Sequence, residues 1–157
     1  MNQRGPVFIR LGDRGRPHQE DLERPGVGVL RNVVISNIAA KGADAIGCSI
    51  TGPPGHLVER ITLRDDHIEF AGGSAAEQAR RVPEELPDKY PEYRMFDTLP
   101  AYGFYLRHTR GIRMDGVSLV TKTPDARPAI AQDDVEACTL TGIVENAADH
   151  SRGKREP

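Results

Sequence analysis

A short pattern of alternating residues recurs four times along this chain. Each copy has two apolar residues separated by one residue, then a polar residue and a turn residue. The copies are residues 32–38, 60–66, 111–117 and 137–143, and their first apolar positions lie 28, 51 and 26 residues apart. Alternation with a period of two, closed by Asn, Asp or Gly, is typical of a short strand with one buried face. The spacing of 51 indicates one repeat plus an insertion.

A second short strand precedes the last two copies at a fixed distance. Phe104 lies 8 residues before Ile112, and Ile130 lies 8 residues before Cys138. Residues 8–11 and 46–50 resemble further copies with looser spacing. Repeats with two or three strands and polar turns are typical of stacked repeats of about 20–45 residues. The sequence therefore predicts an all-β fold, a parallel β-helix of several coils.

In such a stack, residues at one position of successive coils form a ladder. Three ladders are predicted: Val33, Ile61, Ile112, Cys138; Ile35, Leu63, Met114, Leu140; and Ile38, Asp66, Val117, Ile143. Asp66 interrupts the third, which predicts either a bulge or a shifted register at that coil. Cys48 and Cys138 would lie several coils apart, at about 4.8 Å per coil, beyond disulfide reach. We interpret both as small buried apolar residues.

Residues 71–100 are predicted to form a long Pro-rich loop inserted into the stack. Residues 75–82 are expected to form a short helix, with Ser74 as N-cap and Glu77 in the capping-box position. Aromatic residues near the end of the loop predict that it forms the wall of a cleft. The whole chain then forms one β-helix domain, residues 1–144, followed by a flexible polar tail, residues 145–157.

Composition excludes several classes of partner and cofactor. With 21 Lys+Arg against 23 Asp+Glu, the net charge is −2, so we expect no nucleic-acid partner and no membrane partner. There is no run of 18 apolar residues and no signal peptide at the N-terminus, so we expect no spanning helix and leave the compartment open. The five histidines lack metal-ligand spacing, and no Gly-rich phosphate loop occurs. We therefore expect neither a metal nor a cofactor.

Three segments, residues 8–14, 28–38 and 99–108, carry a resemblance to a known family. In their order, and with the Pro-rich insertion between them, they resemble the C-terminal part of glycoside hydrolase family 28, the polygalacturonase-like enzymes, in a bacterial branch. The resemblance covers most of residues 5–143. It implies a right-handed parallel β-helix and inverting hydrolysis of galacturonan or pectin-type chains by two carboxylates. Members of the family are often secreted or periplasmic.

The resemblance also implies two substrate-binding residues, Arg10 and Tyr105. Arg10 matches the arginine of the family's Arg-x-Lys segment, which helps to bind the substrate carboxylate, whereas Gly12 stands at the lysine position. A guanidinium suits a bidentate contact with a carboxylate, but Arg10 is equally explained as a solvated strand residue. Tyr105 aligns with a family tyrosine that lines the sugar subsites, and the alternative is a ring that covers a core edge.

No catalytic residue is assigned. Asp133 and Asp134 resemble the family's catalytic pair. In the family a Gly-His element and an Arg-x-Lys segment follow that pair, whereas here neither follows it. Neighbouring strand residues also face opposite sides of the strand. We interpret this pair, and Asp65 with Asp66, as turn residues. His108, beside a turn, is expected to be structural, with substrate contact as the alternative. In the family the catalytic aspartates precede the arginine that Arg10 matches, and only nine residues precede Arg10 in this sequence.

The leading functional hypothesis is therefore the C-terminal portion of a polygalacturonase-like hydrolase, which binds an acidic polysaccharide and is inactive as an isolated chain. One alternative is a noncatalytic β-helix that binds acidic glycans through Arg10, Arg14, Arg16 and the loop around Tyr93 and Tyr102. Another is a purely structural module. Because an uncapped first coil presents apolar side chains and unpaired strand edges, we expect self-association through it.

Overall fold

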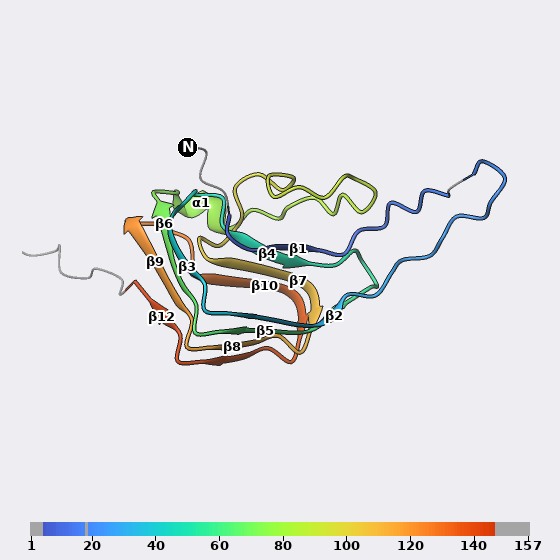
Figure 1. Ribbon diagram of the computed structural model, residues 1–157. Helices are drawn as coiled ribbons and strands as arrows, with labels where there is room; N and C mark the ends of the chain where they lie inside the picture. The colour runs from blue at the N-terminus through green and yellow to red at the C-terminus, as the bar shows by residue number, and fades with distance from the viewer. Residues whose placement is uncertain (1–4, 18, 147–157) are drawn as a thin grey trace, which may run out of the picture.

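Two sheets of parallel strands form the framework of this chain. The computed structural model describes residues 5–17 and 19–146. The strands are β1 (Phe8–Arg10), β2 (Arg31–Ser36), β3 (Ala39–Ala43), β4 (Cys48–Thr51), β5 (Val58–Arg64), β6 (His67–Gly72), β7 (Phe104–Arg110), β8 (Arg113–Asp115), β9 (Ser118–Thr123), β10 (Ile130–Glu136), β11 (Thr139–Thr141) and β12 (Val144–Glu145). One helical turn, α1 (Ala76–Ala79), lies between β6 and β7 (Figure 1).

Strands three apart in chain order pair with one another, always in parallel. One set contains β1, β4, β7 and β10, the second β2, β5, β8 and β11, and the third β3, β6, β9 and β12. Three consecutive strands thus form one repeat, and four repeats stack (Figure 1). The first two sets join into one eight-stranded sheet where the start of β5 pairs with the end of β7. The chain is all-β with parallel sheets, an arrangement compatible with a β-helix.

The strand pairings follow the predicted ladders. Val33 pairs with Ile61, and Leu63 pairs with both Ile35 and Met114. The second strand of the sequence pattern is also present, because Ile130 of β10 pairs with Phe104 of β7. The third set of strands was not identified from the sequence. In β3 the segment Ala39–Ala43 alternates too weakly in hydrophobicity to indicate a strand by itself.

The irregularity expected in the repeat of Asp66 is present where β3 pairs with β6, but it does not lie at Asp66 itself. Pairing is in register on both sides of this residue, from Ser36 with Arg64 to Ala39 with His67. Asp66 is 1% exposed, and its Oδ1 accepts a hydrogen bond of 2.8 Å from the N–H of Ile38 in the preceding repeat. The carboxylate thus bonds to the neighbouring repeat instead of displacing it. The shift of register in this sheet lies further on, between Ala40 and Ala43.

Turns between the strands recur at equivalent positions with the left-handed backbone conformation. After the second set of strands the residues with positive φ are Asn37 (61°), Asp65 (56°), Gly116 (65°) and Gly142 (59°). Asn, Asp and Gly are the residues that adopt this conformation most readily. The turn residue that closes each copy of the sequence pattern therefore serves to direct the chain from the second set of strands into the third.

The core lies between the three sets of strands and is built mostly from aliphatic side chains, with the three rings of Phe70, Tyr102 and Phe104. Fully buried members include Ile50, Leu106, Ile61, Leu63, Met114, Ile68 and Leu119, each 0% exposed. Phe70 and Tyr102 close one side of it, with ring centroids 6.1 Å apart in an edge-on arrangement. Each inward residue is covered by the repeats before and after it, which is why burial is complete only in the middle of the stack.

The insertion between β6 and β7 packs on the outside of the first set of strands (Figure 1). Phe96 and Leu99 from the insertion form a second apolar cluster with Tyr105 of β7. The predicted helix is shorter than residues 75–82, and the predicted Ser74 cap is wrong, because Ala75 is the N-cap of α1 and no side chain caps it. Ser74 instead donates its N–H to Asp125 Oδ2 at 3.2 Å.

One further segment lies outside the stack. Residues 11–17 and 19–30 belong to a long loop that extends away from the strands (Figure 1). Of the predicted tail, Glu145 belongs to β12, and residues 147–157 lie outside the described part. Within residues 5–17 and 19–146, no helix is both long enough and apolar enough to cross a membrane.

Candidate functional site

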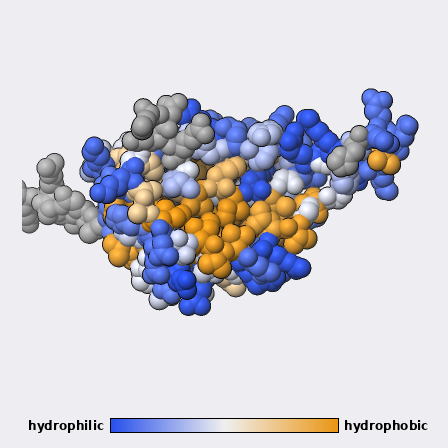
Figure 2. All heavy atoms as spheres, in the orientation of Figure 1, coloured by the Kyte–Doolittle hydropathy of each residue, from blue (hydrophilic) through white to orange (hydrophobic). Residues whose placement is uncertain are grey.

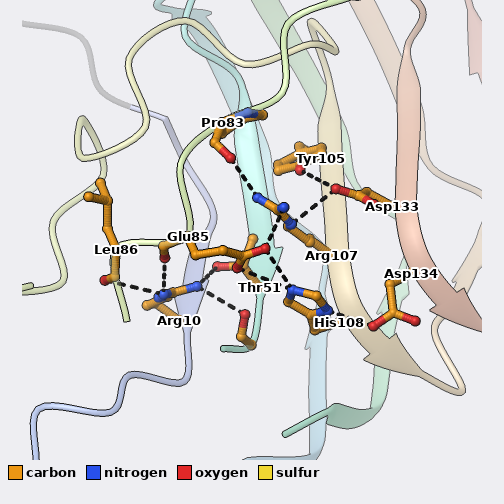
Figure 3. Close-up of polar contacts among 11 residues, drawn as sticks. Arg10, Thr51, Pro83, Glu85, Leu86, Tyr105, Arg107, His108, Asp133 and Asp134 are labelled. Carbon is orange, nitrogen blue, oxygen red and sulfur yellow. Dashed lines mark hydrogen bonds and ion pairs between the residues drawn. The ribbon is translucent and has the colours of Figure 1, made fainter. Parts of the chain in front are cut away.

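Polar side chains gather on the outer face of the first set of strands, where the insertion covers it (Figure 3). Four of them occupy one ladder, one from each repeat: Arg10, Thr51, Arg107 and Asp133. His108 and Asp134 follow in the next position, and Glu85 comes from the insertion. We call these seven residues the polar cluster.

Arg10 is bound by the chain's own oxygens. Its Nη1 donates to Thr51 Oγ1 at 3.2 Å and to the carbonyl of Gly52 at 3.1 Å, and its Nη2 donates to the carbonyl of Glu85 at 2.7 Å. The guanidinium also lies 5.3 Å from the centroid of the Phe96 ring. Burial lowers the pKa of Arg10, and Glu85 partly offsets this, but a guanidinium stays charged. Arg10 therefore links the first two repeats to the insertion.

Arg107 connects the insertion to the last repeat. Its Nη1 donates to the carbonyl of Pro83 at 2.7 Å, and its Nη2 forms an ion pair with Glu85 Oε1. Its Nε lies 3.0 Å from Asp133 Oδ2, an ion-pair distance at which the N–H is not aligned for a hydrogen bond. The Arg107 side chain is 11% exposed, against 44% for Asp133, so the carboxylate is the more accessible partner.

His108 lies between two carboxylates. Its Nδ1 is 2.5 Å from Asp134 Oδ2, and its Nε2 is 3.1 Å from each carboxylate oxygen of Glu85. A carboxylate only accepts hydrogen bonds, so both contacts are hydrogen bonds when the ring carries both protons. The expected structural role of His108 agrees with this geometry, since the ring joins β7, β10 and the insertion.

Tyr105 packs inward of the polar cluster and is 2% exposed. Its hydroxyl donates to Asp133 Oδ2 at 3.1 Å, and burial, the largest cause, raises its pKa above the ordinary value. With the ring enclosed by Phe96 and Leu99, a sugar can stack on it only if the insertion moves. Tyr105 thus covers one edge of the apolar core in this structure, and its role in sugar binding stays a prediction.

A groove of about 350 Å³ opens beside the polar cluster. The insertion lines one side with Arg80, Arg81 and Val82, and the strands line the other with Tyr105, Arg107 and Asp133. Arg81 donates to the carbonyls of Phe96 and Thr98. Arg80, by contrast, is exposed and makes no side-chain hydrogen bond or ion pair within the described residues. The insertion therefore forms one wall of this groove, but the aromatic residues on which the predicted cleft wall rested do not line it.

The structure separates the two predicted binding residues. Tyr105 lines the groove, whereas Arg10 does not, since Arg10 faces the loop of residues 85–86 and Phe96. Their roles in binding stay predictions. Asp133 and Asp134 both lie within β10, so the interpretation of this pair as turn residues is wrong, although Asp134 has a left-handed φ of 54°. Asp133 faces Arg107.

Arg107 and Glu85 are members that the sequence analysis missed. The sequence does contain a signal for Arg107. If the alignment of Phe104 with Ile130 is extended along the two strands, Arg107 falls beside Asp133, a residue of opposite charge. The sequence contains no such signal for Glu85, because residues within an insertion follow no repeat. Strand register can therefore indicate members of the polar cluster that lie on strands, whereas Glu85 is supplied by the fold of the insertion.

The residues named for the alternative, glycan-gripping site are dispersed. Arg14 lies 5.0 Å from the centroid of the Tyr90 ring, and the Tyr93 hydroxyl donates to Asp44 Oδ2 at 3.1 Å. Tyr102 is buried in the core and donates to the carbonyl of Leu119. The structure does not gather these residues into one surface with Arg10.

The described residues offer no group of three or more His, Cys, Asp or Glu side chains placed to hold a metal ion. The polar cluster itself presents guanidinium groups, one imidazole and partly exposed carboxylates. Comparison of the chain with protein-family models, with curated proteins and with solved structures found no match.

Proposed function

We propose that this chain is the C-terminal part of a polygalacturonase-like glycoside hydrolase with a right-handed parallel β-helix fold, and that its groove binds a segment of acidic polysaccharide. Three features support the proposal. The repeats contain three parallel strands each, the insertion lies against the outer face of one strand set, and the order of the segments resembles that family.

The observation that carries the proposal is the charge of the groove. Three arginines, Arg80, Arg81 and Arg107, line it together with the single carboxylate of Asp133. An excess of guanidinium groups in a partly enclosed groove favours an anionic ligand, because these groups recognise carboxylates in a planar, bidentate geometry. A chain of uronic acids presents such carboxylates at regular intervals.

Calorimetric titration of the 157-residue chain with oligogalacturonides tests the binding. We expect Arg80→Ala to weaken binding by about tenfold, since one lost charge-assisted contact corresponds to about 1.4 kcal/mol. Arg110→Ala is the matched control, because Arg110 lies on β7 outside the groove and pairs with Glu136. A neutral galactan oligomer should not bind. Equal binding of the neutral and acidic sugars, or no effect of Arg80→Ala, would contradict the proposal.

The isolated chain is expected not to hydrolyse the polysaccharide. Inversion needs two carboxylates about 6.5–9.5 Å apart with a water between them, one as acid and one as base. The carboxylates of the polar cluster are instead engaged by Arg107 and His108. Release of reducing ends from polygalacturonate, measured with the purified chain, would refute this expectation.

A second candidate is a purely structural module, favoured by one specific observation. Glu85 pairs with both Arg107 and His108, and Arg10 donates to four oxygens of the chain. Polar groups that satisfy one another in this way stabilise the attachment of the insertion. Under this alternative, oligogalacturonides fail to bind, while substitution of Glu85 still loosens the insertion.

A further inference from the structure

The stack ends in two sets of strands that are paired on one side only. Within the described residues, β1, β2 and β3 pair only with β4, β5 and β6, and β10, β11 and β12 pair only with β7, β8 and β9. We call these the N-terminal edge and the C-terminal edge. Unpaired strand edges are templates for pairing with another chain. Because every pairing is parallel, the N-terminal edge of a second copy has the correct strand direction to follow the C-terminal edge.

The apolar ladders are open at these edges. Leu63 and Met114, in the middle of their ladder, are 0% exposed, whereas Leu140 at the C-terminal edge is 42% exposed. Ile35 begins the same ladder at the N-terminal edge and is only partly buried. Figure 2 shows hydrophobic atoms gathered across the face of the stack turned toward the viewer, between polar margins. A second copy that continued the ladders would place its Ile35 on Leu140 and bury both.

One outward ladder alternates in charge along the stack. Arg31 pairs with Glu59, Glu59 with Arg110, and Arg110 with Glu136. Arg110 Nε lies 2.7 Å from Glu136 Oε2. Opposite charges at paired positions of neighbouring strands are stabilising, and like charges are destabilising. The ladder begins with a cation and ends with an anion, so a copy added in the same direction places its Arg31 beside Glu136 and continues the alternation.

The full edges are complementary in charge as well. The strands of the N-terminal edge contain three basic residues and no acidic ones: Arg10, Arg31 and Lys41. Those of the C-terminal edge contain four acidic residues and no basic ones: Asp133, Asp134, Glu136 and Glu145. Contact between two like edges would oppose like charges, whereas contact between unlike edges joins opposite ones.

We propose that the C-terminal edge of one copy of this chain binds the N-terminal edge of another, so that copies associate head to tail through parallel strands. The contact uses different surfaces on the two partners, and such a contact produces an open series of oligomers unless its geometry closes a ring. This association is independent of any glycan bound in the groove, because the residues that carry it lie at the ends of the stack.

Sedimentation velocity of the 157-residue chain over a roughly hundredfold range of concentration tests the proposal. We expect the average sedimentation coefficient to rise with concentration. Arg31→Glu and Glu136→Arg should each weaken association by about tenfold or more, because each replaces an attraction by a repulsion. Glu77→Arg, on α1 away from both edges, and Arg110→Ala, which removes the Glu136 ion pair without inverting the edge, should leave association unchanged. Thermal melting verifies that every variant folds.

Mixing the two charge-inverted variants distinguishes head-to-tail contact from other arrangements. The Arg31→Glu chain keeps an intact C-terminal edge and the Glu136→Arg chain keeps an intact N-terminal edge, so mixing the two should restore an open series of alternating copies, in which one kind of junction joins the two intact edges and the other joins the two inverted edges, which again carry opposite charges. The double variant should associate again. A monomer at every concentration would overturn the proposal, and so would a dimer that responds to only one inversion, since such a dimer joins two like edges.

Discussion

At the scale of single residues, Asp66 differs most from what its neighbours suggest. Its ladder partners Ile38, Val117 and Ile143 are apolar, and Asp66 itself is 1% exposed. Burial, the largest cause, raises the pKa of Asp66, while hydrogen bonds from backbone N–H groups, Ile38 among them, lower it in part. One of its oxygens, Oδ2, is buried without a hydrogen-bond partner among the described atoms. Asp66 thus accepts a hydrogen bond from the backbone N–H of Ile38, but its own carboxylate is buried.

Asp66→Asn should therefore change how stability depends on pH. A carboxyl whose pKa is raised in the folded state stabilises the fold below its unfolded pKa of 3.8, and this contribution is lost as the pH rises through the folded pKa. The amide retains an acceptor for Ile38 and carries no charge. We expect denaturant unfolding to show equal or higher stability of the variant at pH 7, and a smaller loss of stability as the pH rises from 3.8.

Asp66→Val provides the matched comparison. Valine completes the apolar ladder but leaves the Ile38 N–H without an acceptor, which costs about 1–3 kcal/mol for a buried donor. The valine variant should therefore be less stable than the asparagine variant by about that amount at neutral pH. If valine proved the more stable, the hydrogen bond to Ile38 would have no measurable role.

At the scale of structural elements, a buried ion pair fixes the segment between β9 and β10. Arg127 donates to both carboxylate oxygens of Asp125, at 2.9 and 2.8 Å, and its Nη1 donates to the carbonyls of Leu99 and Ala101. The two side chains are 0% and 1% exposed. Burial acts to raise the pKa of Asp125, but hydrogen bonds from Arg127 and Ser74 outweigh it and the pKa is lowered. The pair thus attaches this segment to the end of the insertion.

Arg127→Leu should lower the free energy of unfolding by about 3–5 kcal/mol, because it leaves the carboxylate of Asp125 buried without its partner. Arg110→Ala, which breaks the exposed pair with Glu136, should cost far less, because solvent screens that pair. Since the pKa of Asp125 is lowered, its contribution is present above the unfolded pKa of 3.8 and is lost as the pH falls through the folded pKa. Urea unfolding at pH 7 compares the stability of the two variants, and urea unfolding in acid measures the contribution of Asp125. Similar losses of stability in the two variants would contradict the stabilising role of the buried Arg127–Asp125 pair.

The insertion is attached to the strands by the polar cluster. Glu85→Gln keeps the size of the side chain but removes its ion pair with Arg107 and its negative charge next to His108. We expect cleavage within residues 73–103 by a nonspecific protease to become roughly tenfold faster, since a lost charged hydrogen bond shifts a local opening equilibrium by about this factor. Glu84→Gln, at the exposed neighbouring position, should have no effect. Equal rates in the two variants would show that Glu85 does not hold the insertion.

At the scale of the whole molecule, the middle of the stack is protected and its ends are open. Cys48 in the second repeat is 0% exposed, and burial raises the pKa of its thiol to about 12. Cys138 in the last repeat is only partly buried, and burial raises its pKa as well. Both thiols are free, in agreement with the prediction that they do not form a disulfide. Their reactivities should differ because only Cys138 lies at an edge.

Alkylation with iodoacetamide at pH 8 and low protein concentration should modify Cys138 at least about a hundredfold faster than Cys48, which requires opening of the stack. Mass spectrometry of the two peptides follows the rates. In the Cys138→Ser variant only the slow reaction should remain, and denaturant should abolish the protection. Equal rates for the two thiols in the folded chain would mean that the middle of the stack opens as readily as its end.

The sequence by itself determined the strands of the first two sets and the turns that follow the second. Alternation of apolar residues depends only on the geometry of an extended chain, and the left-handed turns at Asn37, Asp65 and Gly116 depend only on local backbone preference. Both are properties of a few consecutive residues, so they can be recognised without knowledge of the rest of the fold. The strand positions of Tyr105 and Asp133 could be recognised in this way, although Tyr105 was named from the family resemblance and Asp133 was interpreted as a turn residue.

Only the tertiary structure decided how these residues are used. Arg10 and its partner Thr51 are 41 residues apart, and Glu85 reaches Arg107 from an insertion that follows no repeat. The register at Asp66 likewise depends on a hydrogen bond to another repeat. Such contacts form between groups that stacking brings together, and no local periodicity encodes which donor will meet which acceptor. The groove, the polar cluster and the complementary charges of the two edges are consequences of that stacking.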